Sequence, residues 1–396
     1  MKKKRRRTTK FLIIFDTISA IALIGLAILY FRWEKNLDGQ EDLPVATMDP
    51  EVEKTEEEPV EPEPVDNNIY VTVSATGDCS LGKLQIHGYD GSFDAYYDSN
   101  GPDYFLQNVR DIFATDDFTL VNCEGVLTNE TTHMDKEYVI KGRPEYAAIL
   151  GNSSVEGASL GNNHTSDYGP QSLIDTKNAL AGENIAYAIN DEYGIYTTDS
   201  GIKIGFVSVS MLGDFQTRSN YMQTGLETLR PQVDLLIACV HMGIERENYA
   251  NEDQQAFAHN CIDWGADLVV GNHPHVLQGM EIYNGKLIAY SLGNFCYGGA
   301  HNPSDFDTLV LQQTFCFSPD HTLLDSWDAR IIPCRLSSVA SPNDFCPTPY
   351  TAAEDMARVI AKMNEFSSSN GTIKIDETGV IRKLQLFCRN HRKRMV

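Results

Sequence analysis

Six short apolar runs between residues 69 and 295 each end in polar or glycine-rich residues. Their length suits strands, and several are separated by segments with helical spacing, such as residues 170–185 and 251–266. The first of these segments has Pro170 in its first turn and Gly182 near its end, as many helices do. Strands that alternate with helices predict a layered α/β fold with a largely parallel sheet.

The polar residues that follow these runs are carboxylates, imidazoles and carboxamides. The run ends supply Asp78, Asn122, Glu124, Asn162, Asn163, His164, His241, Glu245, Asn272, His273, His275 and Asn294. The carboxyl ends of parallel strands meet at one rim of a sheet, and this rim is where such folds bind ligands. Side chains that are far apart in the sequence are therefore expected to converge in space.

This residue set predicts a divalent-metal site. Carboxylates, imidazoles and amide oxygens bind zinc, manganese or iron, and two ions about 3.5–4 Å apart can hold a bridging hydroxide. His273 and His275 are expected to turn two imidazoles to one side of an extended segment. Asp78 or Glu124 could bridge two cations, and Asn163 can offer a neutral oxygen. A polar turn or a core histidine explains any one motif alone, but six in series favour one shared site.

The N-terminal part of the chain differs from the rest. Residues 1–10 are strongly basic, and the apolar residues 11–31 are long enough to cross a bilayer core. This order predicts an uncleaved single-pass anchor with a cytoplasmic N-terminus and the remaining chain outside the cell. A cleaved signal peptide is the alternative, but no small-x-small cleavage site follows. Residues 34–67 are rich in Glu and Pro, and we expect a disordered acidic stalk there.

The globular part is expected to comprise a main α/β domain over residues 68–340 and a helix and hairpin appendage over residues 341–396. The formal charge of the chain is −23, while residues 1–33 carry +7, so the remainder carries −30. This charge argues against nucleic acid as a partner. A polyanion would need a bridging cation or a local basic patch in order to bind.

The nine cysteines show no zinc-type spacing such as CxxC. An odd number leaves at least one thiol unpaired within the chain. Cys79 and Cys123 each neighbour a motif residue and could face each other across adjacent strands. Small buried thiols are the simpler interpretation of these residues.

The motifs "TGDCSLG", "NCEG", "GNNHTSDYG", "HMGIE", "GNHPHV" and "YSLGNF" occur in the order and spacing of the CapA family. Over about residues 70–300 the chain resembles these capsule-synthesis proteins, which are linked to poly-γ-glutamate. That family in turn resembles the calcineurin-like metallophosphoesterases. The resemblance therefore implies a four-layer α/β/β/α sandwich with a two-metal site.

The resemblance also implies a role for each motif residue. The metal ligands would be Asp78, Glu124, Asn163, His241, His273 and His275. His164 and His241 would be catalytic, with His164 as a general acid. Residues that contact the substrate or support the ligands would be Asn122, Asn162, Asp167, Glu245, Asn272 and Asn294.

Two features depart from the metallophosphoesterase pattern. Ser80 stands where that pattern has the histidine of Asp-x-His, and Asn122-x-Glu124 replaces its Gly-Asp motif. These changes leave open one metal ion in place of two, or a site that binds a substrate carboxylate.

Two functions follow as alternatives. In the first, the protein is a metal-dependent hydrolase or transferase that attacks a phosphoester or an amide of an acidic polymer, with His164 or His241 handling a proton. In the second, the protein is a non-catalytic accessory subunit of a polymer synthase or exporter, and it binds the polyanion through bound metal. Both place the protein at the cell membrane, with capsule synthase or exporter subunits and a polymer such as poly-γ-glutamate as partners.

Overall fold

The structure is a computed structural model that describes residues 66–384. The predicted cytoplasmic segment 1–10, the predicted anchor 11–31 and nearly all of the predicted stalk 34–67 lie outside the described residues. Within the described part, no helix combines the length and the apolar character needed to span a bilayer.

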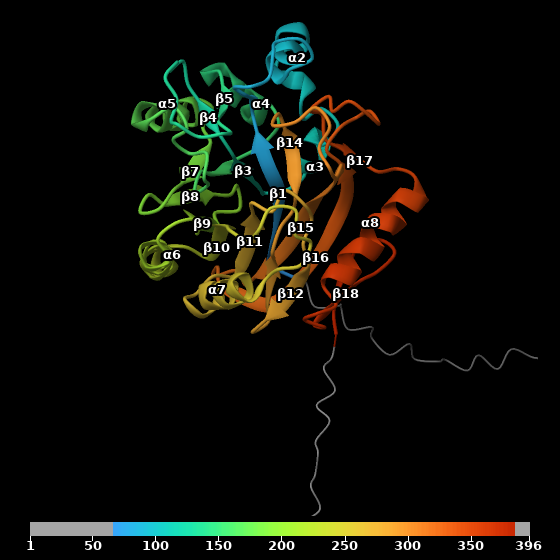
Figure 1. The fold of residues 1–396 in the computed structure, drawn as a ribbon. Helices are drawn as coiled ribbons and strands as arrows, with labels where there is room; N and C mark the ends of the chain where they lie inside the picture. Colours follow the sequence, from blue (N-terminus) through green and yellow to red (C-terminus); the bar gives the residue numbers. More distant parts are fainter. Residues whose placement is uncertain (1–65, 385–396) are drawn as a thin grey trace, which may run out of the picture. The chain divides into compact units, whose positions relative to one another are not determined.

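The larger of the two main sheets has eight strands (Figure 1). Four parallel strands are β1 (Ile69–Ser80), β3 (Phe118–Cys123), β6 (Gly157–Ser159) and β7 (Ala186–Ala188). On the other side of β1 the sheet continues with the antiparallel strands β15 (Asp307–Phe317), β16 (Leu323–Arg335) and β17 (Thr348–Pro349). The short strand β14 (Asn294–Tyr297) runs parallel to the end of β1.

The second sheet has six strands. Its parallel strands are β9 (Lys203–Ser210), β10 (Leu235–His241), β11 (Leu268–Asn272) and β13 (Lys286–Ala289). The edge strands β8 (Gly194–Thr197) and β12 (Met280–Tyr283) are antiparallel. The predicted parallel order is thus present in both sheets. Antiparallel strands extend both sheets, as β15 and β16 do in the larger one, so each sheet is mixed with a parallel part.

Helices and short elements connect these sheets. The helices are α2 (Phe93–Asn100), α3 (Arg110–Phe113), α4 (Ala147–Gly151), α5 (Pro170–Gly182), α6 (Phe215–Leu229), α7 (Glu252–Asp263) and α8 (Ala353–Phe366). Residues 66–384 also contain three 3-10 turns, η1 (Pro102–Tyr104), η2 (Pro144–Tyr146) and η3 (Arg230–Gln232). The small sheets comprise β2 (Lys83–Leu84), β5 (Ile140–Gly142) and β4 (Val126–Leu127), and the hairpin β18 (Ile373–Ile375) with β19 (Ile381–Lys383).

Both helices expected in the central part of the chain are present. The helix α5 begins at Pro170, directly after Gly169, whose φ of 82° suits glycine. The helix α7 begins with a capping box, in which the side chains of Asn251 and Gln254 each bind the other's backbone N–H. The predicted helical spacing is thereby confirmed for these two segments.

Alternating side chains of β9 enter two different apolar clusters. Ile204 and Phe206 belong to a cluster that contains Val73 of β1, so this cluster is shared by the two main sheets. Val207 belongs to a second cluster with Met222 of α6 and residues of α7. Each large apolar side chain that is fully buried contributes about 1.5–3 kcal/mol. One face of β9 thus packs against the first sheet, and the other face packs against α6 and α7. The second sheet therefore lies between the first sheet and these two helices.

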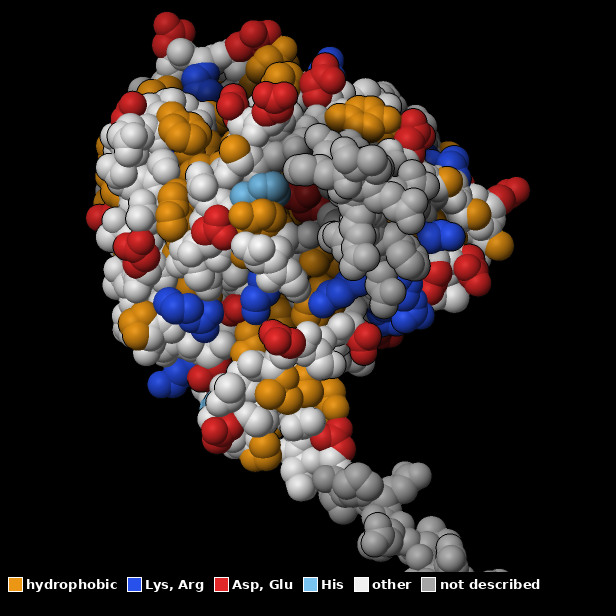
Figure 2. Space-filling model, turned by 90° about the horizontal axis from the view of Figure 1, so that it is seen from below, with side chains coloured by type: hydrophobic (Ala, Val, Ile, Leu, Met, Phe, Trp, Pro, Cys, Tyr) orange, Lys and Arg blue, Asp and Glu red, His pale blue; other side chains and the backbone are white. Residues whose placement is uncertain are grey.

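A third cluster joins the other face of the larger sheet to its helices. Val121 of β3 packs there with Phe105 and with Leu180 of α5. At the C-terminal end of the described part, Val359 and Met363 of α8 join the cluster that the two sheets share. The face seen from below carries acidic and basic side chains between small groups of exposed hydrophobic side chains (Figure 2).

The eight described cysteines are buried free thiols. Cys79 and Cys123 are partners in register on β1 and β3, as the sequence suggested. Burial raises the pKa of each of these two thiols to about 12. They therefore stay protonated and act as small apolar side chains.

Candidate metal centre

The end of β1 forms one side of the centre. Asp78 lies opposite Asn122 of β3 and opposite Asn294 of β14, and Asn122 donates a hydrogen bond of 2.7 Å to Asp78 Oδ1. The backbone N–H of Asp78 donates to the carbonyl of Gly293. A Cβ atom on Gly77 would lie 2.0 Å from this same carbonyl oxygen. Glycine at 77 thus lets the two segments approach closely enough to place Asp78.

The second sheet supplies three histidines. His241 ends β10 beside Asn272, its register partner at the end of β11. His273 and His275 follow in a bend, with φ angles of 103° and 57°. The prediction of an extended segment is therefore wrong. Such left-handed conformations cost about 1–3 kcal/mol each and persist where the surroundings fix them.

One possible ligand group contains Asp78, Glu124 and His275, whose donor atoms all lie within 4.8 Å of one another. His275 Nδ1 lies 3.2 Å from Asp78 Oδ2, and its Nε2 lies 3.8 Å from Glu124 Oε1. Both carboxylates are fully buried. Such a trio of oxygen and nitrogen donors suits a divalent ion.

Glu124 also faces a second set of donors. His241 Nε2 lies 3.6 Å from Glu124 Oε1 and 2.7 Å from Asn163 Oδ1. The His273 ring centroid lies 4.8 Å from that of His241. The same oxygen of Glu124 thus lies within 4 Å of the Nε2 atoms of both His241 and His275.

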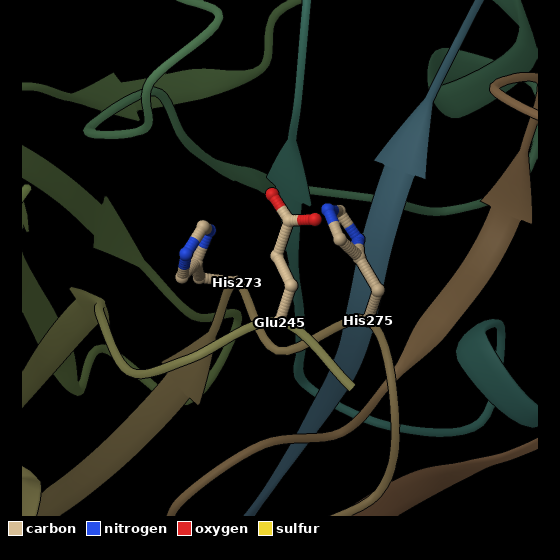
Figure 3. Close-up of side chains that lie close together, drawn as sticks. All are labelled: Glu245, His273 and His275. Carbon is tan, nitrogen blue, oxygen red and sulfur yellow. The ribbon is translucent and has the colours of Figure 1, made fainter. Parts of the chain in front are cut away.

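Glu245 lies closer to the histidines than the sequence suggested. Its carboxylate forms another possible ligand group with His273 and His275, again with all donor atoms within 4.8 Å. Figure 3 shows the Glu245 carboxylate between the two imidazoles, with the three side chains pointing the same way. Glu245 is exposed to solvent, unlike Asp78 and Glu124. It can therefore serve as a ligand at the open side of the centre.

Several buried polar atoms of the centre lack a hydrogen-bond partner within the described part of the chain. They are Asp78 Oδ2, Glu124 Oε1, His273 Nδ1 and Asn272 Nδ2. A buried carboxylate oxygen without a partner costs several kcal/mol relative to water. The two oxygens and the imidazole nitrogen are all metal donors, and they belong to two neighbouring ligand groups, so one or two divalent cations would satisfy them. The residues present therefore fit a metal ion.

The pKa values of the centre follow from burial and from its charges. Burial raises the pKa of Glu124 and lowers the pKa values of His241 and His273. Burial acts against protonation of His275, but the carboxylates of Glu124 and Asp78 outweigh it and raise the His275 pKa to about 10. For Asp78, burial is outweighed by His275 and the other contacts, so its pKa is lowered. A metal ion would replace the His275 proton as the positive charge between the two carboxylates.

His164 sits at the edge of the centre, held by a carboxylate. Its Nδ1 lies 2.6 Å from Asp167 Oδ2, which also accepts the backbone N–H of Ile140 at 2.7 Å. Lys136 donates to Asp167 Oδ1 at 2.7 Å and to the carbonyl of Asn163 at 2.9 Å. With Nδ1–H donated to Asp167, the other ring nitrogen of His164 is free to exchange a proton.

Further side chains position the ligands. The Asn162 amide donates to the carbonyl of Cys123 at 2.9 Å, and its oxygen accepts the backbone N–H of His164 at 3.0 Å. His275 Nδ1 donates to Asn294 Oδ1 at 2.9 Å. Ser80, which stands where the metallophosphoesterase pattern has a histidine, donates to Glu124 Oε2 at 3.2 Å. Ser80 thus supports a ligand from the place where the pattern has one.

All residues predicted for the site lie in this connected set, and their individual roles stay predictions. Lys136 was missed by sequence reasoning. It lies in the loop before β5, and no apolar run or motif marks it. Only its contacts with Asp167 and Asn163 reveal it.

Comparison with known proteins places this centre in a family. Residues 72–298 match a family described as bacterial capsule synthesis protein PGA_cap. The chain is 30% identical over 249 residues to the PGA biosynthesis protein CapA of Bacillus subtilis (strain 168), covering 57% of this chain and 63% of that protein. It is 26% identical over 326 residues to the capsule biosynthesis protein CapA of Bacillus anthracis, covering 72% of this chain and 75% of that protein.

Among solved structures, the chain is similar to a novel phosphatase from Mycoplasma pneumoniae. The TM-score is 0.41 at 13% sequence identity, and the match covers 67% of this chain and 94% of that one. The match to the Bacillus subtilis protein spans less than two thirds of that relative's length. The family resemblance drawn from the six motifs is confirmed by the match over residues 72–298.

Proposed function

This chain belongs to the family of bacterial capsule synthesis proteins, and on that basis we propose that it acts in capsule biogenesis through a divalent-metal centre. The observation that carries the proposal is the pair of fully buried carboxylates, Asp78 and Glu124, each with an oxygen that lacks a hydrogen bond among the described residues. Histidines surround both. Two such oxygens beside imidazole nitrogens form a site for a cation, which would take the place of the proton on His275.

We assign the ligands from the contacts. A first ion would be held by Asp78, Glu124 and His275, and a second by Glu124 together with the following residues: Asn163, His241 and His273. Glu245 would complete either ion from the open side. The donors are nitrogen and oxygen without thiolate, which suits manganese, zinc or iron, as one ion or two.

A bound divalent ion would supply a Lewis acid that activates water and polarises a phosphoryl or acyl oxygen. The chain itself would handle the proton. Asp167 holds the Nδ1–H of His164, and a second proton carried by Nε2 can pass to the leaving group of a phosphoester or an amide, which leaves the ring neutral. Lys136 keeps Asp167 in place and adds a positive charge beside the centre. The reaction class is hydrolysis or transfer on an acidic surface polymer such as poly-γ-glutamate.

A second candidate is a non-catalytic accessory subunit of a polymer synthase or exporter. Ser80 favours it, because the expected histidine ligand is replaced by a hydroxyl that binds Glu124. The residues around Asp78 would then supply one ligand fewer, and a polymer carboxylate could bind in place of the missing ligand. Metal would bind the polyanion without turning it over.

We further propose a four-layer α/β/β/α sandwich for the globular part. The cluster shared by both sheets and the two clusters between sheets and helices support this order of layers. We also propose that residues 11–31 form a single-pass membrane anchor, with residues 34–67 as a spacer and the centre outside the cell. The length of the apolar run and the basic residues before it support this proposal.

Turnover of a γ-linked polyglutamate by the full chain, reloaded with Mn²⁺, Zn²⁺ or Fe²⁺, tests the enzymatic proposal. Chain shortening is expected for the wild type and a loss of about 10²–10⁴-fold for His164→Gln at unchanged metal content. Binding of the polymer without shortening by either protein would support the accessory role. Equal shortening by both proteins would remove His164 from the mechanism.

A further inference from the structure

A cavity of about 400 Å³ lies beside β5, next to the metal centre. Among the residues that line it are three cations and one carboxylate: Lys83, Lys141, Arg143 and Asp94. His133 and Tyr168 form another part of its wall. Three cations against one carboxylate give this lining a positive balance, whereas the whole chain has a formal charge of −23. The cavity therefore offers an anion a favourable place on a protein that otherwise repels it.

The three cations differ in how far they are neutralised. Arg143 pairs with Asp98 and Glu145, so its guanidinium is already engaged. Lys83 lies 3.8 Å from Asp94.

Lys141 has no carboxylate within 4.0 Å among residues 66–384. Its ammonium donates to the carbonyl of Glu130 at 2.8 Å and lies 4.8 Å from the centre of the Tyr168 ring. An ammonium carries three donors, so Lys141 can bind one more acceptor in the cavity.

The cavity and the metal centre share a wall. In β5, Ile140 donates its N–H to Asp167, the carboxylate that holds His164, while the next residue, Lys141, lines the cavity. The neighbouring residues Asp167 and Tyr168 likewise contact the two sites separately: Asp167 contacts His164, and Tyr168 lines the cavity. The cavity wall and the groups that hold His164 are thus neighbours along the chain at two points, residues 140–141 and 167–168.

We propose that this cavity binds a carboxylate of an acidic polymer at a unit next to the one held at the metal centre. The proposal rests on the proposed function and names a subsite for its substrate. One free ammonium matches the single charge of a carboxylate, since the planar fork of Arg143, which suits phosphate, is occupied. The Tyr168 ring offers an apolar surface to the aliphatic part of a polymer unit.

Binding of a fluorescent γ-linked oligoglutamate to the full chain, followed by anisotropy at low salt, tests the subsite. Lys141→Ala is expected to raise Kd about five- to tenfold, and Lys141→Arg to restore most of the affinity. The matched control is Lys374→Ala, which removes the same charge from an exposed position on β18. Metal content and thermal unfolding, measured alongside, verify that the variants keep their centre and their fold.

Each outcome decides one point. Weaker binding by Lys141→Ala alone supports the subsite. Equal Kd values for wild type and Lys141→Ala overturn the subsite and leave the proposed function standing, whereas a wild type with metal that binds no oligoglutamate overturns the proposed substrate itself. Tighter binding of inorganic polyphosphate than of oligoglutamate, also weakened by Lys141→Ala, overturns the carboxylate assignment in favour of a phosphate polymer.

Discussion

Replacing Glu124 by glutamine should stabilise the metal-free protein and remove most of the additional stability that bound metal provides. Without metal, the buried cluster holds two carboxylates, Asp78 and Glu124, against one protonated imidazole, His275, whose pKa of about 10 keeps it charged at neutral pH. With both carboxylates ionised the cluster has an excess of one negative charge, and burial of this charge is the reason that the Glu124 pKa is raised. Glu124→Gln keeps the side-chain shape and leaves Asp78 and His275 as a balanced pair.

Removing an uncompensated buried charge is worth about 1–3 kcal/mol, since the Glu124 Oε1 atom has no hydrogen bond among the described residues. For a domain of this size, that corresponds to a rise in Tm of about 2–6 °C. Metal should instead raise the free energy of unfolding of the wild type, by about 4 kcal/mol when the concentration of free metal is a thousandfold above Kd. Metal should stabilise Glu124→Gln far less, because this variant lacks the Glu124 carboxylate that would bind the ion.

Thermal unfolding of chelated and metal-loaded protein, followed by circular dichroism, measures both effects. The matched control is Asp267→Asn, because Asp267 is also buried but pairs with Arg230 and Lys286. Asp267→Asn should lower the free energy of unfolding by about 1–3 kcal/mol both with and without metal. A chelated Glu124→Gln protein that melts below the chelated wild type would refute the charge argument.

Three other perturbations give separate tests. Burial raises the pKa of Glu156 to about 7, above its value in the unfolded chain, so the contribution of Glu156 to the free energy of unfolding is present below about pH 4.5 and lost as the pH rises through 7. Glu156→Gln should therefore flatten the dependence of the free energy of unfolding on pH in this range. An unchanged dependence would contradict this assignment. Asn294→Ala removes the hydrogen bond to His275 and should weaken metal binding about 10–100-fold in a chelator competition, while equal affinity would show that Asn294 does not position the ligand. Gly77→Ala places a methyl group 2.0 Å from the Gly293 oxygen and should lower the free energy of unfolding by more than about 3 kcal/mol in a urea titration; a small change would mean that the strands can separate freely.

The sequence predicted the convergence of the site because each motif follows an apolar run, and parallel strands deliver their ends to one rim. Asp78, Asn122 and His241 are register-paired strand residues, so their places could be inferred from the order of runs and helices. The helices α5 and α7 carried their own start signals in Pro170 and the Asn251 cap. These features are local, and local features can be read from spacing.

Other features depend on contacts between distant segments. The pairing of β15 with β1 joins residues more than 200 positions apart, and no local periodicity specifies the partner. The left-handed conformation of His273 follows from the surrounding contacts. Lys136 and Lys141 carry no motif, and only the fold places them beside Asp167 and Tyr168.

Metal content is the most direct test of the central claim that the strand ends hold a divalent ion. It is measured by plasma mass spectrometry on the purified full chain beside His241→Ala/His273→Ala, with circular dichroism to confirm that both are folded. We expect one or two transition-metal ions per wild-type chain and a strong loss in the double variant. A folded wild type that stays free of metal after incubation with Mn²⁺, Zn²⁺ or Fe²⁺, or a double variant with unchanged content, would contradict the account.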